Sequence, residues 1–242
     1  MNIYIVRHAE PDYARDSLTE KGWREAELLS RRLEKLPARA YYVSPLGRAR
    51  DTASLTLQKV GAEPIVCDWL QEFHTGYATA PEFHPQGLGW DLLPQELAKD
   101  PRYYDPEQWF LAPAYASTAI AQCYRDVVQH FDAVLEQHGY RREGNLYRVT
   151  QGNKDNLFFF CHFGVECVLL SRLLNCSPVM LWHHTVALPS SVTIVTTEER
   201  REGTASFRMS RFGDLGHLDN AGEPASFFAR FCEVCHDGTR ED

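Results

Sequence analysis

The chain has 242 residues, of which 44% are hydrophobic, so it is long enough to bury one large core. Its formal net charge at pH 7 is −8, and it contains no run of lysines and arginines. We therefore expect no general surface for nucleic acid or for an anionic membrane. The longest apolar stretches are too short to span a bilayer, and Met1 lies directly before the first predicted strand, so we expect neither a membrane anchor nor a signal peptide.

The seven cysteines are an odd number and mostly stand in apolar surroundings, which is typical of reduced core cysteines in a cytosolic protein. Only Cys232, Cys235 and His236 form a close group, near the end of the chain. A zinc site needs four ligands, and no second close pair accompanies this one. We predict an ordinary helical turn there, no metal site, and a cytoplasmic location.

The first 70 residues alternate between strands and helices. A strand at 2–6 precedes a helix that begins at a capping Ser17 or Thr19 and ends at about 36. The next predicted elements are a strand at 40–43, a helix from 44–45 to about 60, and a strand at 64–67. This alternation predicts a mostly parallel sheet with helices on both faces.

Periodicity is lost between 73 and 113, where six prolines interrupt a stretch rich in tryptophan and tyrosine. Long irregular loops in compact domains are usually functional. We predict an insertion at about 73–115 that folds over a pocket as a cap, with coverage of a sheet edge as the alternative.

The remaining chain continues the same pattern. We predict helices at 117–138 and 163–175, strands at 145–150 and 157–161 joined by a hairpin turn at 151–155, and strands at 191–197 and 205–210. The whole chain, 1–242, then forms a single three-layer α/β/α domain with a largely parallel sheet.

Three predicted strands end in residues that suit anion binding. Arg7 and His8 follow the first strand, Arg48 lies in the first turn of the helix after the second, and His162 follows 157–161. In open α/β sheets, ligands bind beyond the carboxyl ends of the strands. Helix N-termini favour anions, and arginine pairs with two phosphate oxygens at once. The sequence therefore predicts a pocket for a phosphoryl group.

These motifs resemble those of the histidine phosphatase superfamily, which has the phosphoglycerate-mutase-like fold. They appear in the family's order as Arg7-His8, Ser44-Pro45-Leu46-Gly47-Arg48-Ala49 with Thr52-Ala53, and His162-x-Gly164. The resemblance covers most of 1–70 and 155–197 and leaves the insertion and the C-terminal tail poorly matched. One departure is Ala9, where the family usually has glycine.

The resemblance implies a role for each site residue. His8 would be the nucleophile, Arg7 and Arg48 would hold phosphoryl oxygens, and His162 would donate to the transferring group, with a further contribution from the amide of Phe163. Glu72, in a Leu-x-Glu pattern, would be the general acid; the sequence that follows departs from the family. This leaves a capping or solvated carboxylate as the alternative for Glu72, and Glu10 and Glu82 as reserve candidates for the acid.

The chemistry is also reasonable without the family resemblance, because neighbouring cations would keep His8 neutral and hence nucleophilic. We predict metal-independent hydrolysis of a small phosphate monoester through a phosphohistidine, with no cofactor. A cofactor-dependent phosphoglycerate mutase and a non-catalytic module that binds a phosphorylated ligand are the alternatives. We expect the histidines outside these motifs to be structural or on the surface, although His183 and His184 could border the pocket. His74 and His84 lie in the insertion and could touch the substrate, and His217 has no role that we can derive.

Overall fold

The computed structural model describes residues 1–73, 79–84, 87–226, 228, 231, 234–236 and 238. The strands of the described chain are β1 (Asn2–Arg7), β2 (Pro11–Asp12), β3 (Ser17–Leu18), β4 (Ala40–Val43), β5 (Ile65–Val66), β6 (Tyr140–Glu143), β7 (Leu146–Val149), β8 (Asn156–Cys161), β9 (Val192–Arg201) and β10 (Thr204–Asp214). Its α-helices are α1 (Glu20–Leu33), α2 (Gly47–Val60), α3 (Pro94–Leu97), α4 (Pro113–Ala116), α5 (Ile120–Gln137), α6 (Phe163–Leu174), α7 (Pro178–His184) and α8 (Gly216–Asp219). Short 3₁₀ turns lie at Asp68–Leu70, Pro101–Tyr104 and Trp109–Leu111.

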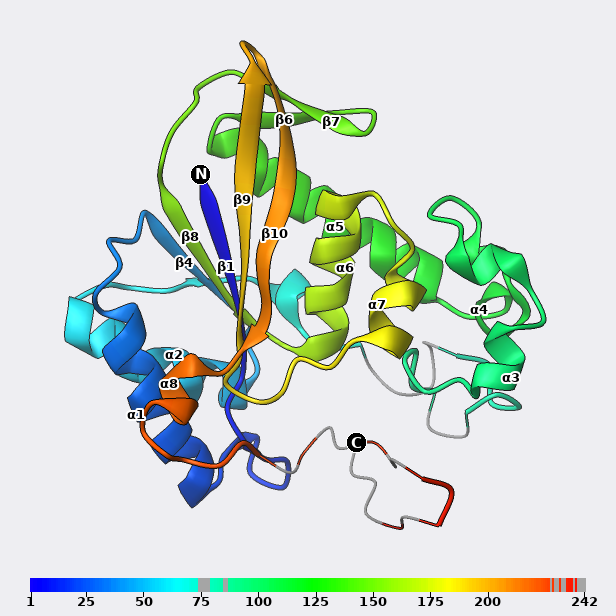
Figure 1. The fold of residues 1–242 in the computed structure, drawn as a ribbon, viewed down its shortest axis with the longest axis horizontal. Helices are drawn as coiled ribbons and strands as arrows, with labels where there is room; N and C mark the ends of the chain where they lie inside the picture. The colour runs from blue at the N-terminus through cyan, green and yellow to red at the C-terminus, as the bar shows by residue number, and fades with distance from the viewer. Residues whose placement is uncertain are drawn as a thin grey trace.

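Eight strands form one sheet in the order β5-β4-β8-β1-β9-β10-β7-β6 (Figure 1). The first four pair in parallel, and the pairings from β1 through β9 and β10 to β7 and β6 are antiparallel. The predicted α/β architecture of the phosphoglycerate-mutase-like type is confirmed. Its parallel half brings the carboxyl ends of β1, β4 and β8 to one edge, as the sequence predicted for Arg7, Arg48 and His162.

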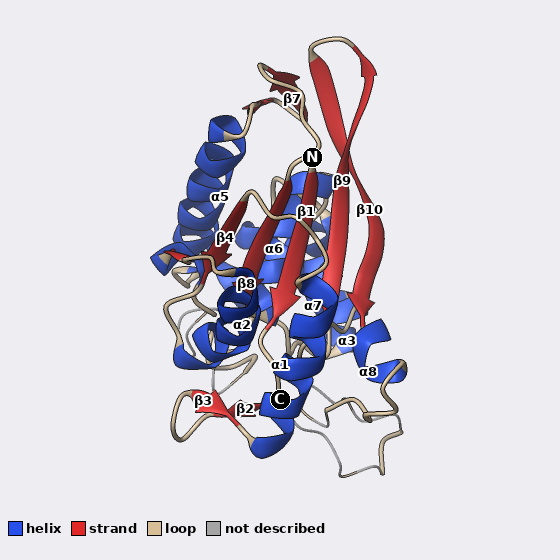
Figure 2. Cartoon of the chain, turned by 90° about the vertical axis from the view of Figure 1, so that its left-hand side faces the viewer, coloured by secondary structure: helices blue, strands red, loops and turns tan. Residues whose placement is uncertain are grey.

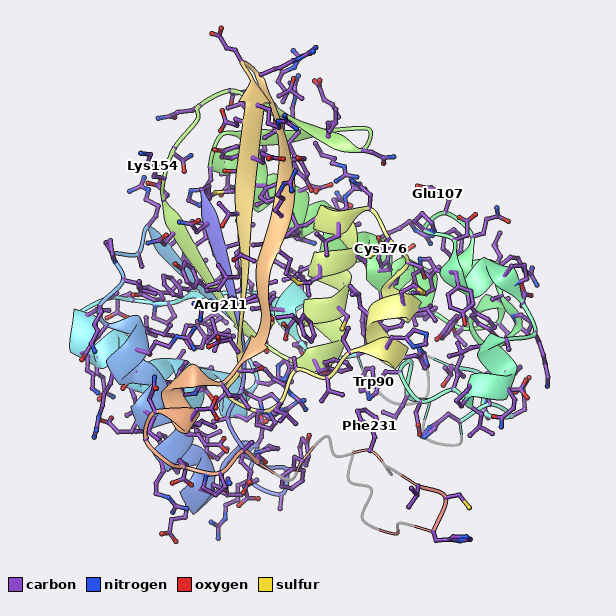
Figure 3. All side chains as sticks on the ribbon, in the orientation of Figure 1. Trp90, Glu107, Lys154, Cys176, Arg211 and Phe231 are labelled. Atoms are coloured by element: carbon purple, nitrogen blue, oxygen red, sulfur yellow. The ribbon has the colours of Figure 1, made fainter. Side chains whose placement is uncertain are left out.

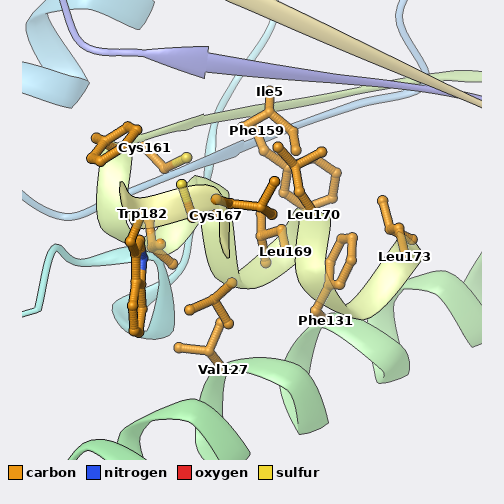
Figure 4. Packing of buried hydrophobic residues seen from close by; sticks show 14 of the residues in the cluster. Ile5, Val127, Phe131, Phe159, Cys161, Cys167, Leu169, Leu170, Leu173 and Trp182 are labelled. Carbon is orange, nitrogen blue, oxygen red and sulfur yellow. The ribbon is translucent and has the colours of Figure 1, made fainter. Parts of the chain in front are cut away.

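Alternate residues of β8 feed two cores on opposite faces of the sheet. Phe158 and Phe160 pack with apolar residues of α1 and α2. Phe159 and Cys161 pack with apolar residues of α5 and α6, as Figure 4 shows at close range. Both faces of this strand are buried, which is consistent with its unbroken apolar run after Asn156. Figure 2 shows the resulting layers, with α1 and α2 on one side of the sheet and α5 and α6 on the other.

The predicted hairpin between 145–150 and 157–161 is wrong. β7 pairs instead with β6, a strand that we had not predicted, through a turn in which Gly144 has a φ of +57°. β8 pairs in parallel with β1 and β4. The glycine and asparagines at 151–155 suit any reversal of the chain, so their composition could not decide which strands pair.

Several predicted boundaries also change. Thr19 is the N-cap of α1, which ends at Leu33 rather than 36. The second helix begins at Gly47, and Ser44 does not cap it. β9 extends beyond the predicted strand to Arg201, into the charged stretch at 198–203, and β10 extends from Thr204 to Asp214. Near the C-terminus, 234–236 form a bend and turn rather than the predicted helical turn, and Cys232 lies outside the described residues.

The described part of the irregular stretch is folded into short helices, and three of its aromatic side chains are almost completely buried. Tyr103, Trp109 and Tyr115 are at most 1% exposed, and the Trp109 ring centroid lies 5.6 Å from that of Trp182 in α7. This segment is therefore packed against α7 and joins the core on the α6 side of the sheet.

No helix in the described part of the chain has both the length and the apolar character needed to cross a membrane. The six described cysteines are free, and three of them, Cys67, Cys161 and Cys167, are buried.

Candidate active site

His8 lies in the loop after β1 with 2% of its surface exposed. Its Nδ1 lies 2.8 Å from the carbonyl oxygen of Ala9, so Nδ1–H donates to that oxygen in the neutral ring and Nε2 carries the lone pair. Burial, followed by the charges of Arg7 and Arg48, holds the pKa of His8 well below its usual range. The ring is therefore neutral at physiological pH, with a lone pair on Nε2.

Arg7 is the last residue of β1 and is buried beside His8. One guanidinium nitrogen donates to the carbonyl of Ala187 at 2.6 Å, and the guanidinium lies 5.7 Å from the ring centroid of Phe163. Burial lowers the pKa of Arg7, which nonetheless starts far above physiological pH. These contacts hold a cation against the first residue of α6.

Arg48 lies in the first turn of α2 and pairs with Asp16, its Nη1 being 2.6 Å from Oδ1. The other carboxylate oxygen of Asp16 accepts from the amide of Gly47 at 2.7 Å. A side chain at Gly47 would meet the backbone of Asp16, with a Cβ only 1.9 Å from its carbonyl oxygen. Glycine therefore lets the Asp16 loop and the start of α2 meet, and Asp16 orients Arg48.

His162 follows β8, caps α6 with extended backbone angles, and is completely buried. Its Nε2 lies 2.8 Å from the Ser44 hydroxyl, and its ring centroid lies 5.1 Å from that of His8. Burial and then His8, Arg48 and Arg7 hold its pKa well below the usual range. When the Ser44 hydroxyl donates to Nε2, Nδ1 carries the proton and is a donor.

Buried nitrogens of these residues lack hydrogen-bond partners among the described residues, namely Arg7 Nε, Arg48 Nε and His162 Nδ1. An unsatisfied buried donor costs about 1–3 kcal/mol, so an anion that accepted from such groups would relieve that cost. The arrangement suits a phosphoryl group.

Glu72 follows the 3₁₀ turn after β5, and its carboxylate meets the N-terminus of α6. It accepts from the amides of Gly164 at 2.9 Å, Val165 at 3.2 Å and Phe73 at 3.1 Å. Burial raises the pKa of Glu72, while the amide hydrogen bonds, Arg7 and Arg48 oppose that shift. Glu72 is thus a helix-capping carboxylate, as the alternative interpretation had it, and also an acid in the electrostatic range of both arginines.

The model of the histidine phosphatase superfamily (branch 1) matches residues 3–208. The chain belongs to this superfamily. The predicted membership is confirmed, and with it the prediction that the chain is a histidine phosphatase. A comparison with curated protein sequences found no match.

Solved structures share the fold, two phosphatases among them. The mycobacterial glucosyl-3-phosphoglycerate phosphatase is 19% identical, with a TM-score of 0.58 over 88% of this chain and 98% of that one. A phosphoserine phosphatase of Entamoeba histolytica, crystallised with phosphoserine, is 16% identical, with a TM-score of 0.57 over 90% and 98%. YhfR of Bacillus stearothermophilus is 22% identical, with a TM-score of 0.56 over 90% and 98%.

The departure at Ala9 is accommodated in this histidine phosphatase. The Ala9 side chain is buried with Leu18 and Ala26, and the Ala9 amide donates to the Thr52 hydroxyl at 2.9 Å. A methyl group fits there, and Thr52 ties the His8 loop to α2.

The two other candidates for the general acid, Glu10 and Glu82, have contacts that differ from those of Glu72. Glu10 accepts from the hydroxyls of Thr19 and Ser226, both at 2.8 Å, and Glu82 is exposed. Glu10 therefore links the His8 loop to the start of α1 and to the C-terminal segment.

The other histidines have mainly structural contacts. His183 Nε2 accepts from the amide of Leu92 at 3.1 Å, and burial lowers its pKa to about 4, so it joins α7 to the irregular segment as a neutral ring. His184 stacks on Tyr104 and His84 pairs with Asp91. His74 lies outside the described residues.

Three contacts of the site could not be predicted from the sequence. Ser44 is the partner of His162, Asp16 is the partner of Arg48, and His217 contacts Ser190. His217 Nε2 lies 3.0 Å from the Ser190 hydroxyl, and the amide of Ser190 donates to the carbonyl of His8 at 3.0 Å. Ser190 has a φ of +62°, so this contact helps to hold an unfavourable backbone conformation next to His8. In the described part of the chain, no group of three or more His, Cys, Asp or Glu side chains could hold a metal ion.

Proposed function

We propose that this protein hydrolyses small phosphate monoesters through a phosphohistidine on His8, without a metal ion or other cofactor. The observation that carries the proposal is the state of His8. Its Nδ1 is committed to the Ala9 carbonyl and two arginines disfavour its protonation, which leaves a free lone pair on Nε2.

In the first step, Nε2 attacks phosphorus and the bond between phosphorus and the ester oxygen breaks. Arg7, Arg48, His162 and the amide of Phe163 bind the non-bridging oxygens, whose charge they stabilise in the transition state. The leaving oxygen takes a proton from Glu72. In the second step, Glu72 takes a proton from water, the water oxygen bonds to phosphorus, and the phosphorus–nitrogen bond breaks to release phosphate and regenerate His8.

Glu72 can donate a proton only when it is protonated. Some of its surroundings raise its pKa and others lower it. Desolvation raises its pKa, and a bound phosphoryl dianion next to it would disfavour its ionisation further. Its proton would come at the expense of one of the hydrogen bonds from the α6 amides. We therefore infer that substrate binding loosens the contact between Glu72 and α6.

Hydrolysis is favoured over the mutase reaction by the charges of the segment that we propose as a cap. Its two cations are paired with their own neighbours: Lys99 lies 2.6 Å from Glu96, and Arg102 lies 2.5 Å from Asp100. A mutase must hold a phosphorylated three-carbon acid while it turns, which calls for free cations in the cap. The phosphatases among the structural neighbours are consistent with hydrolysis.

The test is release of phosphate from a panel of phosphorylated metabolites, before and after dialysis against a chelator. We expect release from at least one monoester, undiminished by dialysis. Activity that is lost on dialysis and restored by zinc or magnesium would contradict the metal-independent mechanism. A second assay supplies 3-phosphoglycerate with a trace of the 2,3-bisphosphate; rapid isomerisation with negligible phosphate release would show a mutase. Phosphate binding without any turnover would favour the non-catalytic module.

A further inference from the structure

A cavity of about 480 Å³ lies between α7 and the segment that begins at Trp90. Its walls include Trp90, Tyr104, Trp182, His184 and Val186. Figure 3 shows Trp90 and Phe231, two of its lining residues, below α7. The volume is within the range of pockets that bind small organic ligands, about 300–1,000 Å³.

The cavity adjoins the proposed phosphate site through two contacts. The Trp90 ring centroid lies 6.3 Å from that of Phe163, whose ring in turn lies 5.7 Å from the Arg7 guanidinium. Val186 precedes Ala187, whose carbonyl accepts from Arg7. One wall of the cavity is therefore continuous with residues that position Arg7, so a monoester held by its phosphate could extend its organic group into this space.

The described residues around the cavity do not favour a second anion. No lysine or arginine lines it among the described residues, and the carboxylate of Asp91 does, paired with His84 at 2.7 Å. His183, another lining residue, already uses both ring nitrogens in contacts with Val179 and Leu92. A leaving group that carries a carboxylate or a further phosphate would find no compensating lysine or arginine among the described lining residues.

The rim of the cavity is apolar and accessible. Tyr104 is 41% exposed, Val186 is 40% exposed, and Leu93, between two lining residues, is 65% exposed. Tyr104 stacks on His184, with centroids 6.4 Å apart. Exposed apolar side chains that gather around a concave site mark ligand-binding surfaces more often than single exposed residues do.

We propose that this cavity binds the leaving group of the substrate, and that the leaving group is an uncharged aromatic or other bulky apolar alcohol. The proposal rests on the proposed phosphatase function and narrows its substrate class. It separates this chain from enzymes whose monoester carries a carboxylate next to the phosphate. Burial of one aromatic ring would favour such a substrate on the order of tenfold or more in kcat/KM.

The first experiment compares four alkyl monoesters: benzyl phosphate, 2-naphthylmethyl phosphate, O-phosphoserine and glycerol 3-phosphate. All four leave as alkoxides, so all need proton donation and differ mainly in the group that enters the cavity. We expect kcat/KM for the two aromatic esters to exceed that for O-phosphoserine by at least tenfold. Equal values, or a preference for O-phosphoserine, would overturn the inference and leave the phosphatase function standing.

Two cavity variants sharpen the comparison. Val186→Lys places a cation at the rim and should lower the aromatic-to-phosphoserine ratio of kcat/KM at least tenfold. Tyr104→Ala removes an aromatic wall and should lower kcat/KM for the aromatic esters alone. The matched control is Leu146→Lys, since Leu146 is also exposed and lies on β7, at the far end of the sheet (Figure 1). A ratio in either cavity variant that equals that of the control would contradict the proposal.

A binding measurement keeps this inference separate from the proposed function. Calorimetric titration with 2-naphthalenemethanol, the phosphate-free product, should show binding that Val186→Lys and Tyr104→Ala weaken at least fivefold. Such binding in a protein that hydrolyses none of the esters would overturn the proposed function and support the cavity. Hydrolysis without measurable binding of this alcohol would overturn the inference alone.

Discussion

Glu166 is a buried acid four residues after His162, and its ionisation should cost the folded protein stability. It is 1% exposed on α6, and neither carboxyl oxygen has a hydrogen-bond partner among the described residues. Desolvation raises its pKa from 4.5 to about 7, although the neighbouring Thr193 side chain and the charge of Arg7 oppose the shift. Glu166→Gln replaces this acid with a neutral group of nearly the same shape.

The size of the stability change follows from the difference in proton binding between the folded and unfolded states. Between pH 4.5 and about 7 the folded protein holds a proton on Glu166 that the unfolded chain has lost, so the wild type loses stability as the pH rises through this window. A shift of about 2.5 pKa units at 1.36 kcal/mol each is about 3 kcal/mol. Glu166→Gln should therefore match the wild type near pH 4.5 and be about 2–3 kcal/mol more stable at pH 8.

The assay is urea denaturation of both proteins at intervals from pH 4.5 to 8, with Glu63→Gln, a change at an exposed carboxylate, as the control. We expect the stability difference to grow with pH for Glu166→Gln and to stay near zero for the control. A difference that does not depend on pH would refute the reasoning. So would a Gln variant that is less stable than the wild type at pH 8.

Three further substitutions test residues near the proposed phosphate site. Glu72→Gln should reduce kcat for alkyl esters at least about a hundredfold and for aryl esters much less, because a phenolate needs little help from an acid; equal losses would assign the general acid elsewhere. Ser44→Ala leaves His162 Nε2 without its partner, at a cost of about 1–3 kcal/mol, so kcat should fall about 10- to 100-fold with a smaller change in KM; an unchanged kcat would remove Ser44 from the site. Gly164→Ala places a Cβ 2.5 Å from Glu72 Oε1 and 2.6 Å from Trp90, so overpacking of about 1–3 kcal/mol should lower the Tm by several degrees; a thermal melt identical to that of the wild type would show that these neighbours move freely.

The residues of the candidate site could be located from the sequence because local signals fixed their elements. β1 and β8 contain the apolar runs 3–6 and 157–161, each followed by a basic residue, and the start of α2 follows a short strand. The carboxyl ends of parallel strands meet at one edge, so Arg7, Arg48 and His162 had to converge. The parallel pairings of β1 with β8 and of β8 with β4 bear out that geometry.

The features that could not be predicted from the sequence depend on contacts between residues far apart in the chain. Ser44 meets His162 across 118 positions, and neither residue type nor spacing marks that pair. The pairing of β7 with β6 and β10 rather than with β8 was likewise hidden, because the composition of 151–155 suits several chain reversals. For the aromatic segment, the sequence predicted an irregular insertion that folds over a pocket but could not name Trp182 as the partner of Trp109.

The most direct test of the catalytic claim is to trap the phosphoryl group on the enzyme. Rapid quenching during turnover of a monoester, followed by peptide mapping under alkaline conditions, should locate acid-labile phosphate on His8. His8→Ala should fold normally, trap none, and lose turnover at least about a thousandfold, on the order of 4 kcal/mol of barrier stabilisation. Phosphate on another residue, or an alanine variant that keeps more than about a thousandth of the turnover, would contradict the account.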